Sequence, residues 1–171
     1  MLTGLKKVIP RGNKKLITGL TLPLLLASGV ASADYNSAYS AYGSGDYKAA
    51  FKEMLPVAEQ GNVDAQFWIA DMYDFGKGVP ENDKAAVKWY TLSAEQGHVS
   101  AQYNLGNMYD FGEGVLTDTK RAYMWYNLAS YNGNELGAKN KDIIAKEMTP
   151  ADISKAQDMS SRCLESNYTD C

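Results

Sequence analysis

Apolar side chains recur along the chain with the spacing of an α-helix. Ala65, Ile69 and Met72 are separated by four and then three residues, so a helix places them on one face. The same spacing returns 36 residues later, at residues 101–108. A second stripe of small and aromatic residues follows each of these, as at residues 86–94. The pattern predicts an all-α protein built from pairs of amphipathic helices.

The sequence also repeats itself with a period of 36 residues. Residues 72–79 read MYDFGKGV and residues 108–115 read MYDFGEGV. A period of this size is typical of stacked supersecondary units, so we expect an α/α solenoid of helix-turn-helix repeats. We predict two full repeats flanked by incomplete units: a half repeat or cap at 34–61, repeats at 62–97 and 98–133, and capping helices at 134–171.

The two glycine-rich octets predict hairpin loops that end the first helix of each repeat. Gly76 and Gly112 can adopt the left-handed backbone angles that a helix C-terminus requires. A phosphate-binding loop is the alternative, but no strand precedes either loop, and the lysine and hydroxyl of a phosphate loop are absent at the required spacing. Second helices are expected to start near Asp83 and Asp118.

Residues 1–33 have the order of a secretory signal peptide. They hold five basic residues and no acidic one, then an apolar run at residues 16–30, then Ala31-Ser32-Ala33. An uncleaved anchor is the alternative, although the run falls short of the roughly 20 residues of a spanning helix. We expect cleavage after Ala33, no membrane insertion afterwards, and a periplasmic or secreted location.

Removal of this leader changes the charge of the protein. The whole chain has a formal net charge of −3, and residues 34–171 keep twelve basic and twenty acidic side chains, a net charge of −8. Nucleic-acid affinity comes largely from Lys and Arg on phosphates, so nucleic acid is not an expected partner.

Both cysteines lie near the C-terminus, at Cys163 and Cys171. In an exported protein, two cysteines this close in sequence favour a disulfide, and two free thiols are the alternative. A zinc site lacks ligands, because His98 is the only histidine in the sequence and no further cysteine exists.

The repeat motif resembles the Sel1-like repeat. The similar features are Leu-Gly-x-Met-Tyr, then Gly-x-Gly-Val, then Lys-Ala or Arg-Ala, then Trp-Tyr, and a Gln-Gly or Asn-Gly exit. The resemblance implies an α/α solenoid related to tetratricopeptide arrays and used mostly for protein interaction. Some relatives have been described as acting on β-lactams, but no Ser-x-x-Lys stands here, so no catalytic serine is carried over.

The sequence offers few candidates for catalysis. We interpret His98 as a solvated residue at a helix start. Asp74 and Asp110 recur at the same place in both repeats; we interpret them as solvated carboxylates, with an acid/base pair or cation site as the alternative. The residues after Asp74 lack the further oxygens of a calcium loop. We predict no catalytic residue, no metal and no cofactor.

One side of each first helix remains free of predicted core positions, and we expect it to bind a partner. Its candidate residues are Phe67, Asp71, Asp74, Tyr103, Asn107 and Asp110. Aromatic rings supply contact area and carboxylates orient basic groups, which suits a peptide with apolar and basic side chains. The alternative is that Phe67 and Tyr103 pack on the neighbouring repeat.

These features together predict an exported, monomeric, non-enzymatic scaffold that binds a peptide or protein partner in a short concave groove. An envelope hydrolase or a protein that binds cell-wall polysaccharide is the alternative. A small structural subunit of a larger envelope assembly is indistinguishable from the first prediction by sequence.

Overall fold

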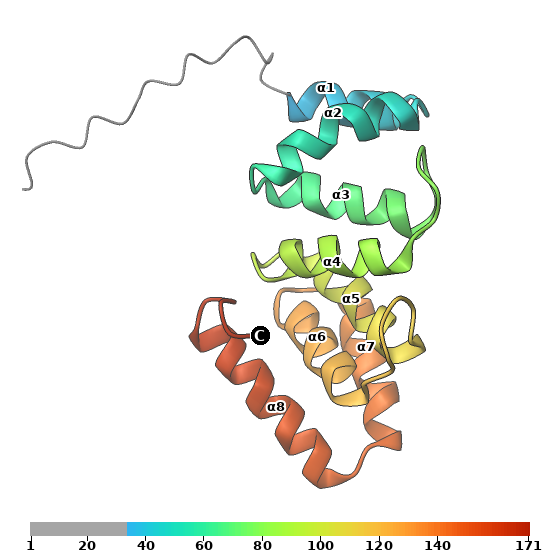
Figure 1. Ribbon diagram of the computed structural model, residues 1–171. Helices are drawn as coiled ribbons and strands as arrows, with labels where there is room; N and C mark the ends of the chain where they lie inside the picture. Colours follow the sequence, from blue (N-terminus) through green and yellow to red (C-terminus); the bar gives the residue numbers. More distant parts are fainter. Residues whose placement is uncertain (1–33) are drawn as a thin grey trace, which may run out of the picture. The chain divides into compact units, whose positions relative to one another are not determined.

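The computed structural model describes residues 34–171, which fold into eight α-helices and one 3-10 turn (Figure 1). The prediction of a signal peptide concerns residues that lie outside this range. In chain order the elements are α1 (Tyr35–Gly43), α2 (Tyr47–Glu59), α3 (Val63–Asp74), α4 (Asp83–Ala94), α5 (Val99–Phe111), α6 (Thr119–Tyr131), α7 (Glu135–Ile144), the 3-10 turn η1 (Ala145–Glu147) and α8 (Pro150–Glu165).

The helices pack as consecutive pairs. Helices α1 and α2, α3 and α4, and α5 and α6 form three pairs, and the second helix of each pair also packs against the first helix of the next (Figure 1). Helix α7 continues this order by packing on α6, whereas α8 returns to pack against α6 as well. The predicted all-α stack of repeats is confirmed.

The predicted apolar stripes form the core. Ala65, Ile69 and Met72 of α3 are fully buried, and their counterparts in α5 are 0–2% exposed. In the second helices, Tyr90 and Tyr126 are likewise fully buried. The small residues let successive helices approach closely, and the large rings fill the space between the layers.

Side-chain caps at a fixed interval start the first helices. Asn62, His98 and Asn134, which stand 36 residues apart, accept the backbone N–H three residues on, over 2.8, 3.1 and 2.7 Å. This cap satisfies an N–H that has no partner within the helix. The second helices begin where expected, near Asp83 and Asp118, and their N-caps are Asn82 for α4 and Asp118 for α6.

The glycine-rich octets form the hairpins that the sequence predicts. Gly76 and Gly112 adopt φ of 63° and 76°, in the left-handed region. The second glycine of each octet allows a close backbone contact. A Cβ on Gly78 would lie 2.9 Å from the backbone nitrogen of Lys48 in α2, in the preceding helix pair. Gly114 approaches Lys84 in the same way, at 2.8 Å. Each loop therefore docks on the start of the previous second helix.

The C-terminal tail is fastened over the repeats. Cys163, which is fully buried, and Cys171 form a disulfide with their Cα atoms 4.6 Å apart. Between them, the hydroxyl of Tyr168 accepts a hydrogen bond from Nδ2 of Asn132 over 2.9 Å. The ring of Tyr168 also lies beside Gly97. The disulfide predicted from sequence is present.

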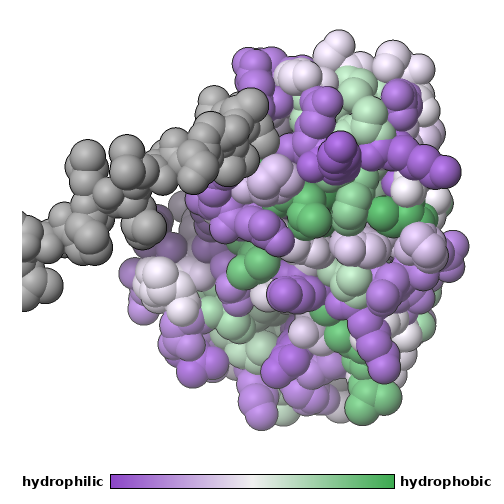
Figure 2. All heavy atoms as spheres, turned by 45° about the horizontal axis from the view of Figure 1, so that its top comes forward, coloured by the Kyte–Doolittle hydropathy of each residue, from purple (hydrophilic) through white to green (hydrophobic). Residues whose placement is uncertain are grey.

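The surface of the described part of the chain is mixed in character. On the face drawn in Figure 2, small apolar groups are separated by hydrophilic residues. Within residues 34–171, no helix is both long and apolar enough to cross a membrane.

Candidate functional site

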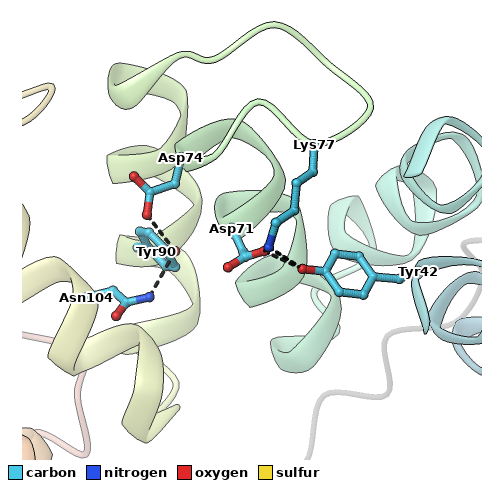
Figure 3. Close-up of polar contacts among 6 residues, drawn as sticks. All are labelled: Tyr42, Asp71, Asp74, Lys77, Tyr90 and Asn104. Carbon is cyan, nitrogen blue, oxygen red and sulfur yellow. Dashed lines mark hydrogen bonds and ion pairs between the residues drawn. The ribbon is translucent and has the colours of Figure 1, made fainter. Parts of the chain in front are cut away.

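Asp74, at the end of α3, belongs to a hydrogen-bonded chain of three side chains (Figure 3). The hydroxyl of Tyr90 donates to Oδ2 of Asp74 over 3.1 Å, and Nδ2 of Asn104 donates to that hydroxyl over 2.9 Å. Burial raises the pKa of Asp74 to about 6 against the lowering effect of the Tyr90 bond, and the nearby acids Glu113, Asp71 and Asp83 add to the rise. Asp74 is therefore a half-buried carboxylate, not the solvated one that we predicted.

Asp71 is neutralised within the protein. Nζ of Lys77 lies 2.8 Å from its Oδ2, and the hydroxyl of Tyr42 donates to the same oxygen over 2.7 Å (Figure 3). Burial opposes the charge of Lys77, but the bonds to Asp71 and Tyr42 raise its pKa to about 12. Asp71 is 8% exposed, so this geometry favours a structural role over the predicted contact with a partner.

Phe67 packs inside the stack. Its ring stacks on the imidazole of His98 in the next repeat, with centroids 4.5 Å apart. His98 is a helix cap with a side chain that is 19% exposed, and burial lowers its pKa, although Asp64 opposes the effect. The prediction that His98 stands at a helix start is confirmed, but its side chain is mostly buried and not solvated as predicted. The geometry of Phe67 matches the alternative of packing on the neighbouring repeat.

A cavity of about 520 Å³ opens between the first helices of the two full repeats and α7. We call it the acidic groove. It is lined by Asp74, Phe75, Glu81, Asp83, Tyr103, Asn104, Asn107, Met108, Phe111, Glu113 and Asn140. Three of the six predicted partner residues, Asp74, Tyr103 and Asn107, meet there.

The charge of the acidic groove is uncompensated. Four of its lining residues are carboxylates and none is basic. Among residues 34–171, none of these four carboxylates forms an ion pair. Phe75 and Phe111 border the groove with 60% and 67% of their surface exposed. The arrangement combines negative potential with open aromatic surface.

Asp110 stands at the position of Asp74 one repeat later but does not join it. Its Oδ2 accepts from the hydroxyl of Tyr126 over 3.0 Å, which reproduces the pairing of Asp74 with Tyr90. Asp110 lines a second cavity instead of the acidic groove. The two aspartates thus make the same hydrogen bond between the two helices of their repeats but face different cavities.

Sequence reasoning missed Glu113, Phe75 and Phe111 as lining residues. A signal was available, because all three lie in the repeated octets and Glu113 marks the single position at which the octets differ. Lys77 in the first repeat corresponds to Glu113 in the second, and Asp71 corresponds to Asn107. The internal ion pair of the first repeat is thereby replaced by an amide and an open carboxylate.

The acids of the acidic groove do not form a set of metal ligands. Within residues 34–171, no group of three or more His, Cys, Asp or Glu side chains is arranged to hold a metal ion. The groove is therefore characterised by its charge and its aromatic border.

Comparison with known families identifies the repeat unit. Residues 63–98 and residues 99–134 each match the Sel1 repeat. The chain belongs to the Sel1 repeat family. The matched ranges begin one residue after the repeats predicted from the sequence. Sel1 repeats generally form protein-interaction scaffolds that are typically non-enzymatic. A comparison with curated proteins gave no match.

Solved structures of other Sel1-repeat proteins share the fold. The protein c5321, a protective antigen of uropathogenic Escherichia coli strains with a Sel1-like repeat fold, superposes with a TM-score of 0.73 at 30% identity over 77% of this chain. A Sel1 repeat protein from Oxalobacter formigenes gives a TM-score of 0.63 at 30% identity over 67% of this chain. This chain spans 29% and 47% of those two proteins, respectively.

Proposed function

We propose that this Sel1-repeat protein is an exported, non-enzymatic scaffold that binds a segment of a partner protein in the acidic groove. The observation that carries the proposal is the set of four carboxylates that have no ion-pair partner within residues 34–171 and lie beside two exposed phenyl rings. The repeat fold alone does not specify a partner, so the function is argued from such a surface site.

The physical basis is charge and aromatic surface. Complementary charge steers a basic segment toward the groove and fixes its orientation. The rings of Phe75 and Phe111 then supply apolar area that is already ordered by the helix ends that carry them. Asn104, Asn107 and Asn140 can hydrogen-bond the backbone of the bound segment.

Two features support export. The sequence begins with the pattern of a signal peptide, and Cys163 and Cys171 form a disulfide, which persists in oxidising compartments. The periplasm or the extracellular space is the location that fits both features.

Site-specific photo-crosslinking in living cells tests the proposed groove. A photoreactive residue replaces Phe111 at the groove in one variant and Tyr131 in a control variant. The two sites are well matched, because each is an exposed aromatic residue at the end of a helix, at 67% and 72% exposure. We expect a discrete protein adduct from position 111 that position 131 does not give.

The outcome decides where the partner binds. An adduct of one mass from position 111, whose partner binds the purified protein, supports the proposal. Equal adducts from both positions, or an adduct from position 131 alone, overturn it. Cell fractionation checks the location independently. The protein is located among the cytoplasmic, periplasmic and secreted fractions.

Cell-wall polysaccharide is the second candidate ligand, because Asp74, whose pKa is raised to about 6 by burial, lies among amide side chains in the same cavity. Such a carboxyl is partly protonated near neutral pH, which suits a general acid or a sugar hydrogen bond. Co-sedimentation with insoluble cell-wall material that is lost in Asp74→Asn would favour this candidate.

A further inference from the structure

A second cavity extends the acidic groove. It has a volume of about 320 Å³ and is lined by Asp110, Phe111, Asn140, Ile143, Ile144 and Glu147. We call it the apolar cavity for the two isoleucines and Phe111 in its wall; Asp110, Asn140 and Glu147 form the polar half of the lining. Phe111 and Asn140 line both cavities, so the two are adjacent and share a wall. One bound segment can therefore reach both.

The apolar cavity continues onto an uncovered face of α7. Leu136, Asn140 and Ile143 follow the i, i+4, i+7 spacing that aligns side chains on one side of a helix. Leu136 and Ile143 are 55% and 49% exposed. Helix α8, the following helix, packs against α6. This leaves apolar surface beside the acidic groove.

The difference between the two repeats indicates which charge the partner brings. In the first repeat, Lys77 supplies the cation that neutralises Asp71. In the second repeat, Glu113 stands in place of Lys77, and its charge acts on Asp74 across the groove. The aspartate that Lys77 neutralises is also replaced, by Asn107, so Glu113 is left as a carboxylate without a counter-ion among residues 34–171. A cation from outside the described residues would compensate the charge of Glu113.

The geometry points to a partner segment that places a lysine or arginine in the acidic groove and a bulky apolar side chain in the apolar cavity, on either side of Phe111. This inference rests on the proposed function, since it names the chemistry of the segment that the groove binds. Lys77 illustrates the favourable packing of a cation on a ring, with its Nζ 4.9 Å from the centroid of Phe75.

Binding of labelled peptides to the purified full chain, as processed by the cell, tests the inference. The main probe is a short peptide of lysine and leucine, and two matched probes replace every leucine with serine or every lysine with glutamate. Fluorescence anisotropy gives each dissociation constant. The measurements are made at physiological ionic strength because salt screens long-range charge effects. Circular dichroism confirms that each protein variant keeps its helices.

Three protein variants separate the two cavities. Glu81→Lys/Glu113→Lys reverses charge in the acidic groove, and Ile143→Ser removes apolar surface from the second cavity. Glu59→Lys/Asp158→Lys makes the same change in net charge at exposed positions that line neither cavity. We expect the dissociation constant of the lysine–leucine probe to rise at least about tenfold in the groove charge variant and at least about threefold in Ile143→Ser. In the control charge variant it should stay within about twofold of the parent value.

The matched probes complete the test. The lysine–serine probe should bind weakly and ignore Ile143→Ser, and the glutamate–leucine probe should not bind. Equal losses in the groove and control charge variants, no effect of Ile143→Ser, or binding of the glutamate–leucine probe would each overturn the inference. The proposed function fails separately: an adduct at position 111 with unselective peptide binding overturns only the inference, whereas selective peptide binding without that adduct overturns only the function.

Discussion

The hydroxyl of Tyr90 donates a hydrogen bond to the carboxylate of Asp74 over 3.1 Å, and Tyr126 makes the same bond to Asp110 over 3.0 Å one repeat later. Each bond joins the end of the first helix of a repeat to the buried ring of its second helix. The joint is thus a repeated structural element. Its surroundings differ, because Glu113 adds negative charge near Asp74.

The raised pKa of Asp74 predicts a pH-dependent stability difference for Asp74→Asn. The folded protein holds this pKa near 6, above the ordinary 3.8, so ionised Asp74 opposes folding. Above about pH 6 we expect the variant to be more stable by about 1 kcal/mol, a value discounted for the half exposure of the group. The advantage should shrink as the pH falls through 6 toward 4, where the parent binds its proton on folding. Urea unfolding at several pH values measures this difference.

A control variant separates this effect from net charge. Asp158→Asn removes the same charge from an exposed position on α8. If both variants change stability equally at every pH, the local environment of Asp74 is not the cause.

The sequence predicted the repeats because their causes are local. Helical spacing placed Ile69 and Leu105 in the core, and the need for left-handed backbone angles placed Gly76 and Gly112 at the hairpins. Cys163 and Cys171 were paired correctly because they are the only two cysteines in the sequence and the loop between them is short enough to close readily. Each of these features depends on a few neighbouring residues.

The site was harder to predict because its residues meet only in three dimensions. The partner of Asp71 proved to be Tyr42, 29 residues away in another helix, together with Lys77. The acidic groove draws on α3, α4, α5 and α7 and on both hairpins, and helical spacing within one helix carries no information about that combination. Comparison of Lys77 with Glu113 was the one sequence signal available.

Gly106 predicts a destabilising alanine substitution. A Cβ at this position of α5 would lie 2.6 Å from Cδ1 of Tyr126, whose ring is fully buried. We expect Gly106→Ala to lower the free energy of unfolding by about 1–3 kcal/mol, since the ring must shift in a packed core. Chemical denaturation measures the loss.

Gly43→Ala is the matched control. Gly43 ends α1, and a methyl group on its Cα would meet no atom within 4 Å. This position should therefore accept alanine with no loss or a gain of about 0.5 kcal/mol. Equal stability of the two variants would contradict close packing of α5 on the ring of Tyr126.

The disulfide predicts a local loss of order in Cys171→Ser. The bridge closes a short loop at residues 163–171 and keeps Tyr168 bonded to Asn132 beside Gly97. Its removal frees the tail in the unfolded chain, which in the loop-entropy account lowers the free energy of unfolding by about 2–3 kcal/mol. Hydrogen exchange should rise most in residues 166–171, whose order depends directly on the bridge. In α3 to α6, protection should fall by no more than the loss in global stability, because amides that exchange only through global unfolding report that free energy. Reductant should bring the parent to the stability of the variant and leave the variant unchanged.

If protection fell equally in α3 and α4, the tail would be an integral part of the repeat core, and its role as a fastening over a self-sufficient stack would be wrong.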